Sequence, residues 1–299
     1  EIRIMLPFLG RFPIHGQLGL LLVLIFWMLN WLLSGLLQGS DNPALTSHVG
    51  FFPLWLGYSL TVDALVFFRK GHSMISRNYR AYMQLFLVSC PVWWLFELIN
   101  WRTGNWFYQG RDSFSNLQYF LFASVSFSTV IPAVFGTAEL SSTFNWIRRT
   151  QFGVKIASSQ TLSIPMFVIG WCMLGLMLWK PKYYFPFVWI SVHFIIEPIN
   201  VWLGNETLLR HLEKGDWRPI CALATGCLIC GFFWEMWNFY SYPKWVYQIP
   251  FVGFFKIFEM PILGYGGYIP FSFELFAIYH LFVGFIKQED NKQFIQLGL

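Results

Sequence analysis

Charged side chains are scarce in this chain. Only 12% of its 299 residues are Asp, Glu, Lys or Arg, whereas 56% are apolar and 21% are aromatic. Soluble domains usually carry about 25% charged residues, because their surfaces must stay hydrated. The composition therefore excludes an ordinary soluble fold and predicts a protein whose main partner is the lipid bilayer.

Several catalytic and binding motifs are absent as well. The chain has no P-loop, G-x-G-x-x-G, G-x-S-x-G or H-E-x-x-H pattern, so nucleotide hydrolysis and serine or zinc protease chemistry are not expected. Its five cysteines all lie in apolar stretches, and Cys227-x-x-Cys230 has no second pair or suitably spaced His. We interpret these cysteines as packing residues and predict no metal site.

What the chain does have is long apolar stretches with few charges. An α-helix needs about 20 such residues to cross a bilayer, and the stretches lack the alternation of a membrane β-barrel. The sequence predicts an all-α, polytopic membrane helix bundle of about eight transmembrane helices. The predicted spans are 17–38, 51–69, 82–102, 118–142, 160–179, 184–204, 218–241 and 262–287.

Lys and Arg are distributed unevenly between the loops that join these spans. The loops and termini on one side hold 14 of them, among them Arg77 and Arg148, and the loops on the other side hold 6. The positive-inside rule then places both termini in the cytoplasm of a multi-pass protein of the cell (inner) membrane. Because anionic headgroups account for the basic loops, the net charge of +5 requires no nucleic-acid partner.

The chain also resembles itself at a fixed offset. Phe96-Glu97-x-x-Asn100 matches Trp234-Glu235-x-x-Asn238 at an offset of 138, and Ile131-Pro132 matches Ile269-Pro270 at the same offset. Trp106-x-Tyr108-Gln109 matches Trp245-x-Tyr247-Gln248 at 139. We interpret this as a duplication into two tandem four-helix repeats, 1–150 and 151–299. Since four spans is an even number, both repeats would cross the membrane in the same sense, with a cavity between them.

Acids inside the predicted spans are the main candidates for chemistry, because an unpaired charge is costly in lipid. Glu97 and Glu235 each precede an asparagine, Asn100 or Asn238, by three residues, which places acid and amide on one helix face. Burial would keep these acids neutral, so that they act as proton donors or cation ligands. The alternative is that they only hold helices together by hydrogen bonds.

A second group of polar residues lies at the other ends of the spans. Asp63 and Glu197 fall near the predicted inner ends of spans two and six, and His193 precedes Glu197 by one helical turn. These three residues could form a proton path or serve packing alone. A single His and Glu fall short of the three or four ligands that a metal site needs.

The last predicted span is interrupted by glycine and proline. Gly264, Tyr265, Gly266, Gly267, Tyr268, Ile269 and Pro270 precede the stretch that carries Glu274 and His280. Broken backbone at membrane depth is tolerated where it lines a cavity. Because the first repeat has no counterpart of Glu274 or His280, they could be an acid and base of the second repeat, or a packed pair.

The loops that follow Glu97 and Glu235 are rich in aromatic residues. Most of these rings are expected in the belt at the membrane interface. Trp106 and Tyr108 follow Glu97 as Trp245 and Tyr247 follow Glu235. We predict that these four rings cover the cavity, together with Asn100, Asn238, Tyr265 and Tyr268.

One known family shows a similar order of motifs. Phe233-Trp234-Glu235, Trp245-x-Tyr247 and the segment from Ile269-Pro270 to Glu274 resemble membrane lycopene cyclases and the related carotenoid hydratases. In the first repeat Phe96-Glu97, Gly104-x-Trp106-x-Tyr108 and Ile131-Pro132 are similar, although the acid after the proline comes later, at Glu139. The resemblance implies acid catalysis on an isoprenoid, with Glu97, Glu235 and Glu274 as acids.

Three functional hypotheses follow. The first is a membrane enzyme that protonates, cyclises or hydrates a hydrophobic, isoprenoid-like small molecule. The second is a non-catalytic subunit that binds other membrane subunits and holds lipid, quinone or pigment. The third is a transporter. No cofactor is evident from the sequence, but a bound lipid, quinone or carotenoid would fit either of the first two.

Overall fold

Long apolar helices dominate the fold, as the composition predicts. The computed structural model describes residues 12–37, 47–286 and 294–298. In these ranges seven helical segments are long and apolar enough to cross a membrane. They are α2 (Ile14–Leu37), α3 (Ser47–Lys70), α5 (Tyr79–Thr103), α6 with α7 (Asn116–Phe127 and Val130–Ser142), α9 (Ser159–Trp179), α13 (Arg218–Phe239) and η4 with α14 (Ile262–Gly267 and Tyr268–Ile286).

The remaining predicted span, 184–204, is bent. The short α10 (Pro181–Tyr184) and η3 (Phe185–Trp189) meet α11 (Ser191–Leu203) at 41°, and together they have the length and composition of an eighth span. The predicted fold class, an all-α multi-pass membrane bundle, is confirmed. The predicted end of the first span at 38 and both chain termini lie outside the described residues.

Short elements connect the long helices. The helical ones are α4 (Met74–Arg77), η1 (Arg111–Ser113), α8 (Asn145–Arg148), η2 (Arg149–Phe152) and α12 (Leu208–Lys214). The strands are β1 (Trp106–Gln109), β2 (Lys244–Tyr247), β3 (Lys256–Ile257) and β4 (Met260–Pro261), which form two antiparallel pairs, β1 with β2 and β3 with β4.

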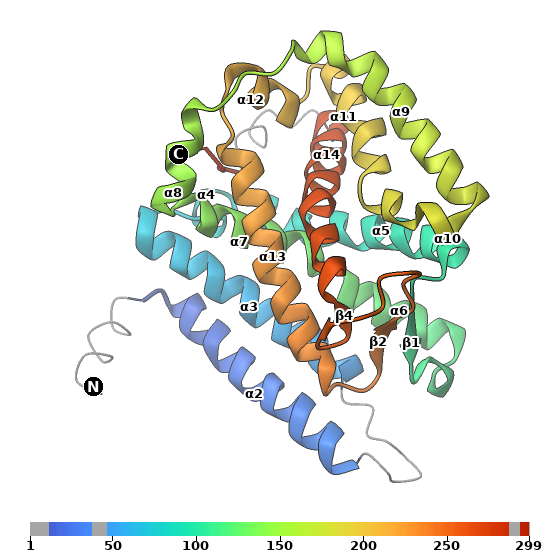
Figure 1. Cartoon of the computed structure of the whole chain (residues 1–299). Coiled ribbons are helices and arrows are strands. Elements are labelled where there is room, and N and C mark those ends of the chain that lie inside the picture. Colours follow the sequence, from blue (N-terminus) through green and yellow to red (C-terminus); the bar gives the residue numbers. More distant parts are fainter. Residues whose placement is uncertain (1–11, 38–46, 287–293, 299) are drawn as a thin grey trace.

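The central helices are α7, α13 and α14, and two helix pairs flank them. Helix α2 lies along α3 on one side of the bundle, and α9 lies along α11 on the other (Figure 1). Between them α7 packs against α3 and α13, whereas α14 packs against α11 and α13. The Phe135 ring of α7 meets the Tyr279 ring of α14 at 5.4 Å. The bundle core is therefore shared by both halves of the chain.

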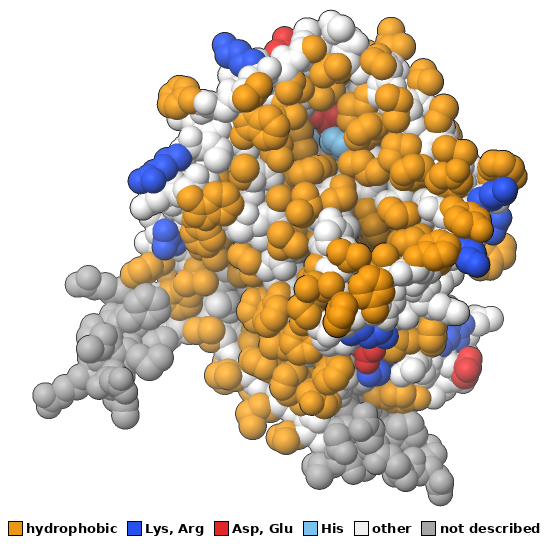
Figure 2. Space-filling view, in the orientation of Figure 1, with side chains coloured by type: hydrophobic (Ala, Val, Ile, Leu, Met, Phe, Trp, Pro, Cys, Tyr) orange, Lys and Arg blue, Asp and Glu red, His pale blue; other side chains and the backbone are white. Residues whose placement is uncertain are grey.

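The outer helices present apolar side chains outward. On α2 the side chains of Leu18, Leu21 and Leu24 are each more than half exposed, and Ile164 and Val168 on α9 are too. Hydrophobic side chains cover most of the face seen in Figure 2. In water this surface would be unfavourable, so these helices contact the lipid bilayer.

A serine satisfies the backbone where span 116–142 is broken. The α6–α7 junction precedes Pro132, whose ring nitrogen cannot donate a hydrogen bond. The Ser89 hydroxyl of α5 donates to the Phe127 carbonyl at 2.6 Å and accepts from the Ile131 amide at 3.0 Å. One buried side chain thus supplies both partners that the break removes from the helix.

Candidate functional site

The site is built around the strand pair β1–β2, which joins the two halves of the chain. Trp106 lies opposite Tyr247, and Tyr108 lies opposite Trp245. Alternate residues of a strand, and residues directly opposite in a pair, share one face, so all four rings lie on the same side of the ribbon. The two W-x-Y motifs are thus related as if by a two-fold axis between the strands.

Two asparagines hold these strands in place. They are Asn100 and Asn238, which follow Glu97 and Glu235 at the same spacing. Asn100 donates from Nδ2 to the Trp106 carbonyl at 2.8 Å and accepts at Oδ1 from the Asn105 amide at 2.9 Å. Asn238 donates to the Trp245 carbonyl at 2.7 Å and accepts from the Trp245 amide at 3.0 Å. Each amide therefore binds strand backbone.

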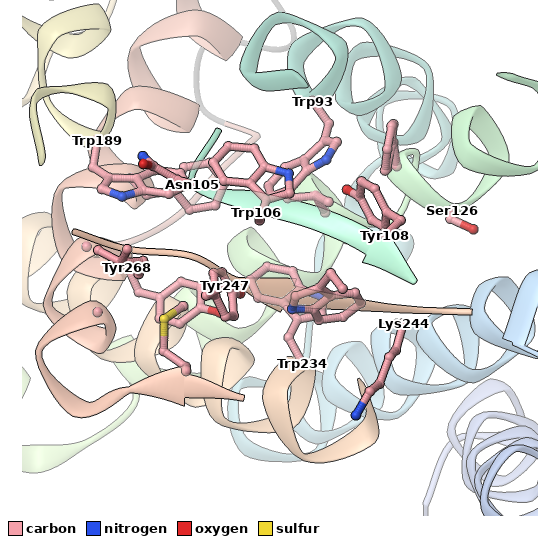
Figure 3. A pocket seen from close by; sticks show the side chains of 18 of the residues that line it. Trp93, Asn105, Trp106, Tyr108, Ser126, Trp189, Trp234, Lys244, Tyr247 and Tyr268 are labelled. Carbon is pink, nitrogen blue, oxygen red and sulfur yellow. The ribbon is translucent and has the colours of Figure 1, made fainter. Parts of the chain in front are cut away.

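A cavity of about 500 Å³ lies against this aromatic face. Both halves contribute to its wall, which is almost entirely apolar. Figure 3 shows Trp93, Trp106 and Tyr108 in one row of rings with Trp189, and Trp234 and Tyr247 in a second row. The size and lining are those of a small-molecule site.

Glu97 lies behind the first row of rings. Its Oε1 accepts three hydrogen bonds from side chains that line the cavity: Trp93 Nε1 at 3.1 Å, Trp106 Nε1 at 3.0 Å and the Tyr108 hydroxyl at 2.6 Å. The carboxyl group itself is not part of the wall. It therefore fixes the orientation of three wall residues at once.

Glu235 has the equivalent position behind the second row. Its Oε1 accepts from the Tyr247 hydroxyl at 2.6 Å, the Tyr268 hydroxyl at 2.7 Å and Trp245 Nε1 at 3.4 Å. The side chain is fully buried, and among the described residues Oε2 has no hydrogen-bond partner. The two oxygens of this carboxyl thus differ sharply in their surroundings.

The third donor differs between the two acids because of Gly231. In the 138-residue offset Gly231 matches Trp93, so the second half lacks that ring. A Cβ at position 231 would stand 2.5 Å from the Tyr268 ring. The glycine therefore makes room for Tyr268, which replaces tryptophan as the third donor and brings a phenolic hydroxyl to Glu235.

The two strand tyrosines remain hydrogen-bond donors over a wide pH range. Burial, together with the charge of Glu97, raises the pKa of Tyr108 well above its ordinary value. Burial and the charge of Glu235 raise the pKa of Tyr247 in the same way. Both hydroxyls therefore stay protonated and can donate to the carboxyl groups.

The structure separates the predicted cavity residues into two sets. Trp106, Tyr108, Trp245, Tyr247 and Tyr268 line the cavity. The residues that line it do not include Asn100 or Asn238, which bind the strands, or Tyr265, whose hydroxyl donates to the Ile257 carbonyl at 3.1 Å.

Glu274 and His280 lie on α14 away from the cavity wall. Glu274 accepts at Oε1 from the Val192 amide at 3.1 Å, and the His280 ring packs on Phe276 with centroids 4.3 Å apart. Within the described residues no hydrogen bond joins the two side chains, and Glu274 Oε2 and His280 Nε2 have no partner. The structure therefore does not bring them together as an acid and base.

The predicted proton-path residues serve two helix starts. Asp63 accepts from the Ser73 hydroxyl at 2.6 Å and from the Ile75 amide at 3.1 Å at the start of α4. Glu197 accepts from the Leu209 amide at 2.9 Å at the start of α12. His193 instead contacts the Phe273 carbonyl at 3.2 Å. Among the described residues no hydrogen bond links these three side chains, and no group of three or more His, Cys, Asp or Glu could hold a metal ion.

Several site residues had no place in the sequence-based prediction. Trp93 precedes Glu97 by four residues, so helical spacing could have identified it as a neighbour on the same face. Trp234 stands next to Glu235 in the repeated motif. Trp189 and Arg111 carry no such signal, because only the folded chain brings them to the cavity wall.

Comparison of the chain with family models, curated proteins and solved structures finds no significant match. The fold and the site define an integral membrane protein with an aromatic cavity backed by two glutamates, of which Glu235 is fully buried and Glu97 is half-buried. The resemblance to lycopene cyclases rests on the motifs alone.

Proposed function

We propose that this membrane protein binds an elongated, isoprenoid-like molecule in the aromatic cavity and transfers protons to and from it. The observation that carries the proposal is the Glu235 cluster. A fully buried carboxyl with one unpartnered oxygen is hydrogen-bonded to two tyrosines that line an apolar cavity.

The cavity suits an unsaturated hydrocarbon better than a polar molecule. Rings from both halves surround it, and aromatic faces stabilise a nearby positive charge by cation–π attraction. A cation formed on an isoprenoid chain would meet several such faces at once. An apolar wall also disfavours water, which would otherwise trap the cation.

The proton source would be Glu235 acting through Tyr268. A proton on Oε2 would remove an unpaired charge from an apolar environment, where ionised groups are costly. In the proposed step the Tyr268 hydroxyl gives its proton to a ligand double bond, forming a C–H bond and a carbocation. The phenolate oxygen then takes the carboxyl proton, which must first be placed on Oε1, the oxygen 2.7 Å from the Tyr268 hydroxyl, and Glu235 is left as a carboxylate. Loss of a proton from the cation to the Glu235 carboxylate through Tyr268 closes the cycle without any other reactant.

The motif resemblance points to the same chemistry. The lycopene cyclase type of enzyme protonates an isoprenoid, and Glu235 with the aromatic loop after it is the part of this chain that is most similar. Glu97 has the same kind of surroundings in the first half, so it would be the second acid to test. Glu274, which lies away from the cavity wall, would come third.

A second candidate function also has a specific observation in its favour. Each glutamate accepts three hydrogen bonds at one oxygen and thereby fixes the cavity wall. A non-catalytic subunit that holds a quinone, lipid or pigment needs such a rigid wall and no proton transfer.

The first experiment identifies what the cavity holds. The full chain is purified in mild detergent, its lipids are extracted, and their masses and absorption spectra are recorded. A stoichiometric isoprenoid, quinone or carotenoid is expected. If only bulk phospholipid is recovered, and none of these three classes of compound binds when added, the proposal is wrong.

Deuterium exchange then separates the enzyme from the subunit. The ligand is incubated with the protein in heavy water, and deuterium on its carbon atoms is measured by mass spectrometry. Reversible protonation introduces deuterium, and Glu235→Gln should abolish this while the ligand stays bound. A bound ligand that gains no deuterium with the native protein supports the non-catalytic subunit instead.

A further inference from the structure

The charged side chains on the cavity wall are both cations. They are Arg111 and Lys244, and among the described residues no Asp or Glu lines the cavity. A wall that serves only a neutral hydrocarbon needs no charge, and both of these cations are half-buried at its edge. A cation on the wall therefore favours a ligand whose polar end is negatively charged.

Lys244 is already neutralised. Its Nζ donates to Glu259 Oε1 and to the Phe239 carbonyl, and Figure 3 shows the amine pointing away from the rings. Arg111 differs, because none of the ion pairs between described residues includes it. Within residues 12–37, 47–286 and 294–298 it is the one charge of the wall that has no counter-charge.

Arg111 is also held in place. Its Nη1 donates to the Phe114 carbonyl at 3.0 Å and its Nη2 to Asn116 Oδ1 at 2.6 Å, and the guanidinium lies 4.2 Å from the centre of the Tyr119 ring. Two of its five N–H donors are used in these bonds. A guanidinium with free donors is suited to bind phosphate, often through two hydrogen bonds.

The charge lies at one end of the site only. The Tyr119 ring, which contacts the Arg111 guanidinium, has its centroid 6.1 Å from that of the Tyr108 ring. The Tyr108 hydroxyl in turn donates to Glu97. In the 139-residue offset the counterpart of Arg111 is Pro250, so the Glu235 end has no equivalent cation. A ligand with one anionic end would therefore bind in a single orientation.

We propose that the ligand is an isoprenoid phosphate, with its phosphate at Arg111 and its unsaturated chain along the rings toward Glu235. This rests on the proposed function and narrows it from apolar molecules in general to anionic amphiphiles. It also directs the proton donor Tyr268 to the hydrocarbon end of the ligand.

The test compares two ligands that differ only at the head. Native protein in phosphatidylcholine nanodiscs is titrated with geranylgeranyl phosphate and with geranylgeraniol, and native mass spectrometry gives both affinities. The phosphate should bind at least tenfold more tightly. Arg111→Gln should reduce phosphate affinity to that of the alcohol and leave alcohol binding unchanged, and Arg111→Lys should retain part of the preference.

Matched controls separate the possible outcomes. Arg102→Gln removes another arginine that does not line the cavity, and it should change neither affinity. Equal binding of the two ligands by the native protein, or a loss of both in Arg111→Gln, would overturn the inference but leave the apolar site intact. If phosphatidic acid competes as well as geranylgeranyl phosphate, the selectivity for an isoprenoid chain is wrong. Failure of both isoprenoids to bind would instead contradict the proposed function.

Discussion

The glycine at position 231 determines which side chain donates to the neighbouring acid, Glu235. Gly231 lets the Tyr268 ring reach Glu235, whereas the first half places Trp93 at the equivalent position beside Glu97. Glu97 thus has one phenol among its donors, Tyr108, whereas Glu235 has two, Tyr247 and Tyr268, and a phenol exchanges its proton more readily than an indole N–H. The two halves can therefore have similar contacts and unequal reactivity.

Gly231→Ala should displace Tyr268. The added Cβ would contact the ring at 2.5 Å, and such overpacking typically costs about 1–3 kcal/mol. A lower thermal midpoint and loss of deuterium incorporation into the ligand are expected. The matched control is Gly175→Ala on α9, where the added Cβ has nothing within 4 Å. Equal stability of the two variants would contradict this explanation.

Single residues also show the limits of prediction from sequence. The repeated spacing identified Trp106, Tyr108, Trp245 and Tyr247, because polar and aromatic matches at one offset are rare by chance. The same reasoning did not identify the neighbours of Tyr265 and His280, neither of which lines the cavity. A polar residue in an apolar segment indicates burial, but it does not indicate which neighbour the side chain faces.

At the scale of elements, the broken helix α6–α7 depends on Ser89. Ser89→Ala should leave the buried Phe127 carbonyl and Ile131 amide without their side-chain partner, which costs about 1–3 kcal/mol. The thermal midpoint of the purified protein measures this loss. Ser128→Ala, at the same break, removes a hydroxyl that bonds only to Val125 of its own helix, and should have little effect. Similar losses in both variants would show that the break does not depend on Ser89.

The loop before α12 should respond to acid. A hydrogen bond with His211 lowers the pKa of Glu206 below its ordinary value of 4.5. Because the folded-state pKa is the lower one, this contribution to stability is complete above about pH 4.5 and is lost as the pH falls through the lowered pKa. The Glu206 side chain is 39% exposed, so the contribution should stay below about 1 kcal/mol.

The measurement is the thermal midpoint at pH 6 and at successive steps below pH 4.5, for the native protein and for Glu206→Gln. The variant should lose less stability on acidification. Identical acid sensitivity would mean that the ion pair contributes nothing measurable.

The helix boundaries followed closely from the sequence, because long apolar stretches have few alternatives in a membrane. The bend before α11 could not be predicted from the sequence. Pro181 lies between the predicted spans 160–179 and 184–204, and Pro186 lies inside the second of them. Hydropathy alone cannot distinguish a straight span from two helical pieces at 41°.

For the whole molecule, the orientation in the membrane stays a prediction from the charge pattern. Asp112 and Arg149 are exposed and lie in loops that the positive-inside rule places on opposite sides. A cysteine introduced at 112 should react with an impermeant maleimide in intact cells, whereas one at 149 should react only after the membrane is opened. The reverse labelling pattern would invert the predicted orientation.

The duplication also stays an interpretation at this scale. Asn100 and Asn238 each bind the strand that follows them, and Glu97 and Glu235 each accept from a strand tyrosine. The pairing of β1 with β2 could not be read from the sequence. Strand β1 ends at Gln109 and β2 begins only at Lys244, so the two strands meet only in the folded chain.

The strand pair limits how a ligand can enter and leave the site. Transporters built from two repeats expose their site alternately by rocking one half against the other. Here the backbone of β1 is hydrogen-bonded to that of β2 at the cavity, so such rocking would have to break the ladder. We therefore expect the cavity to load sideways from the lipid phase, so that membrane fluidity rather than solvent access limits how fast its contents exchange.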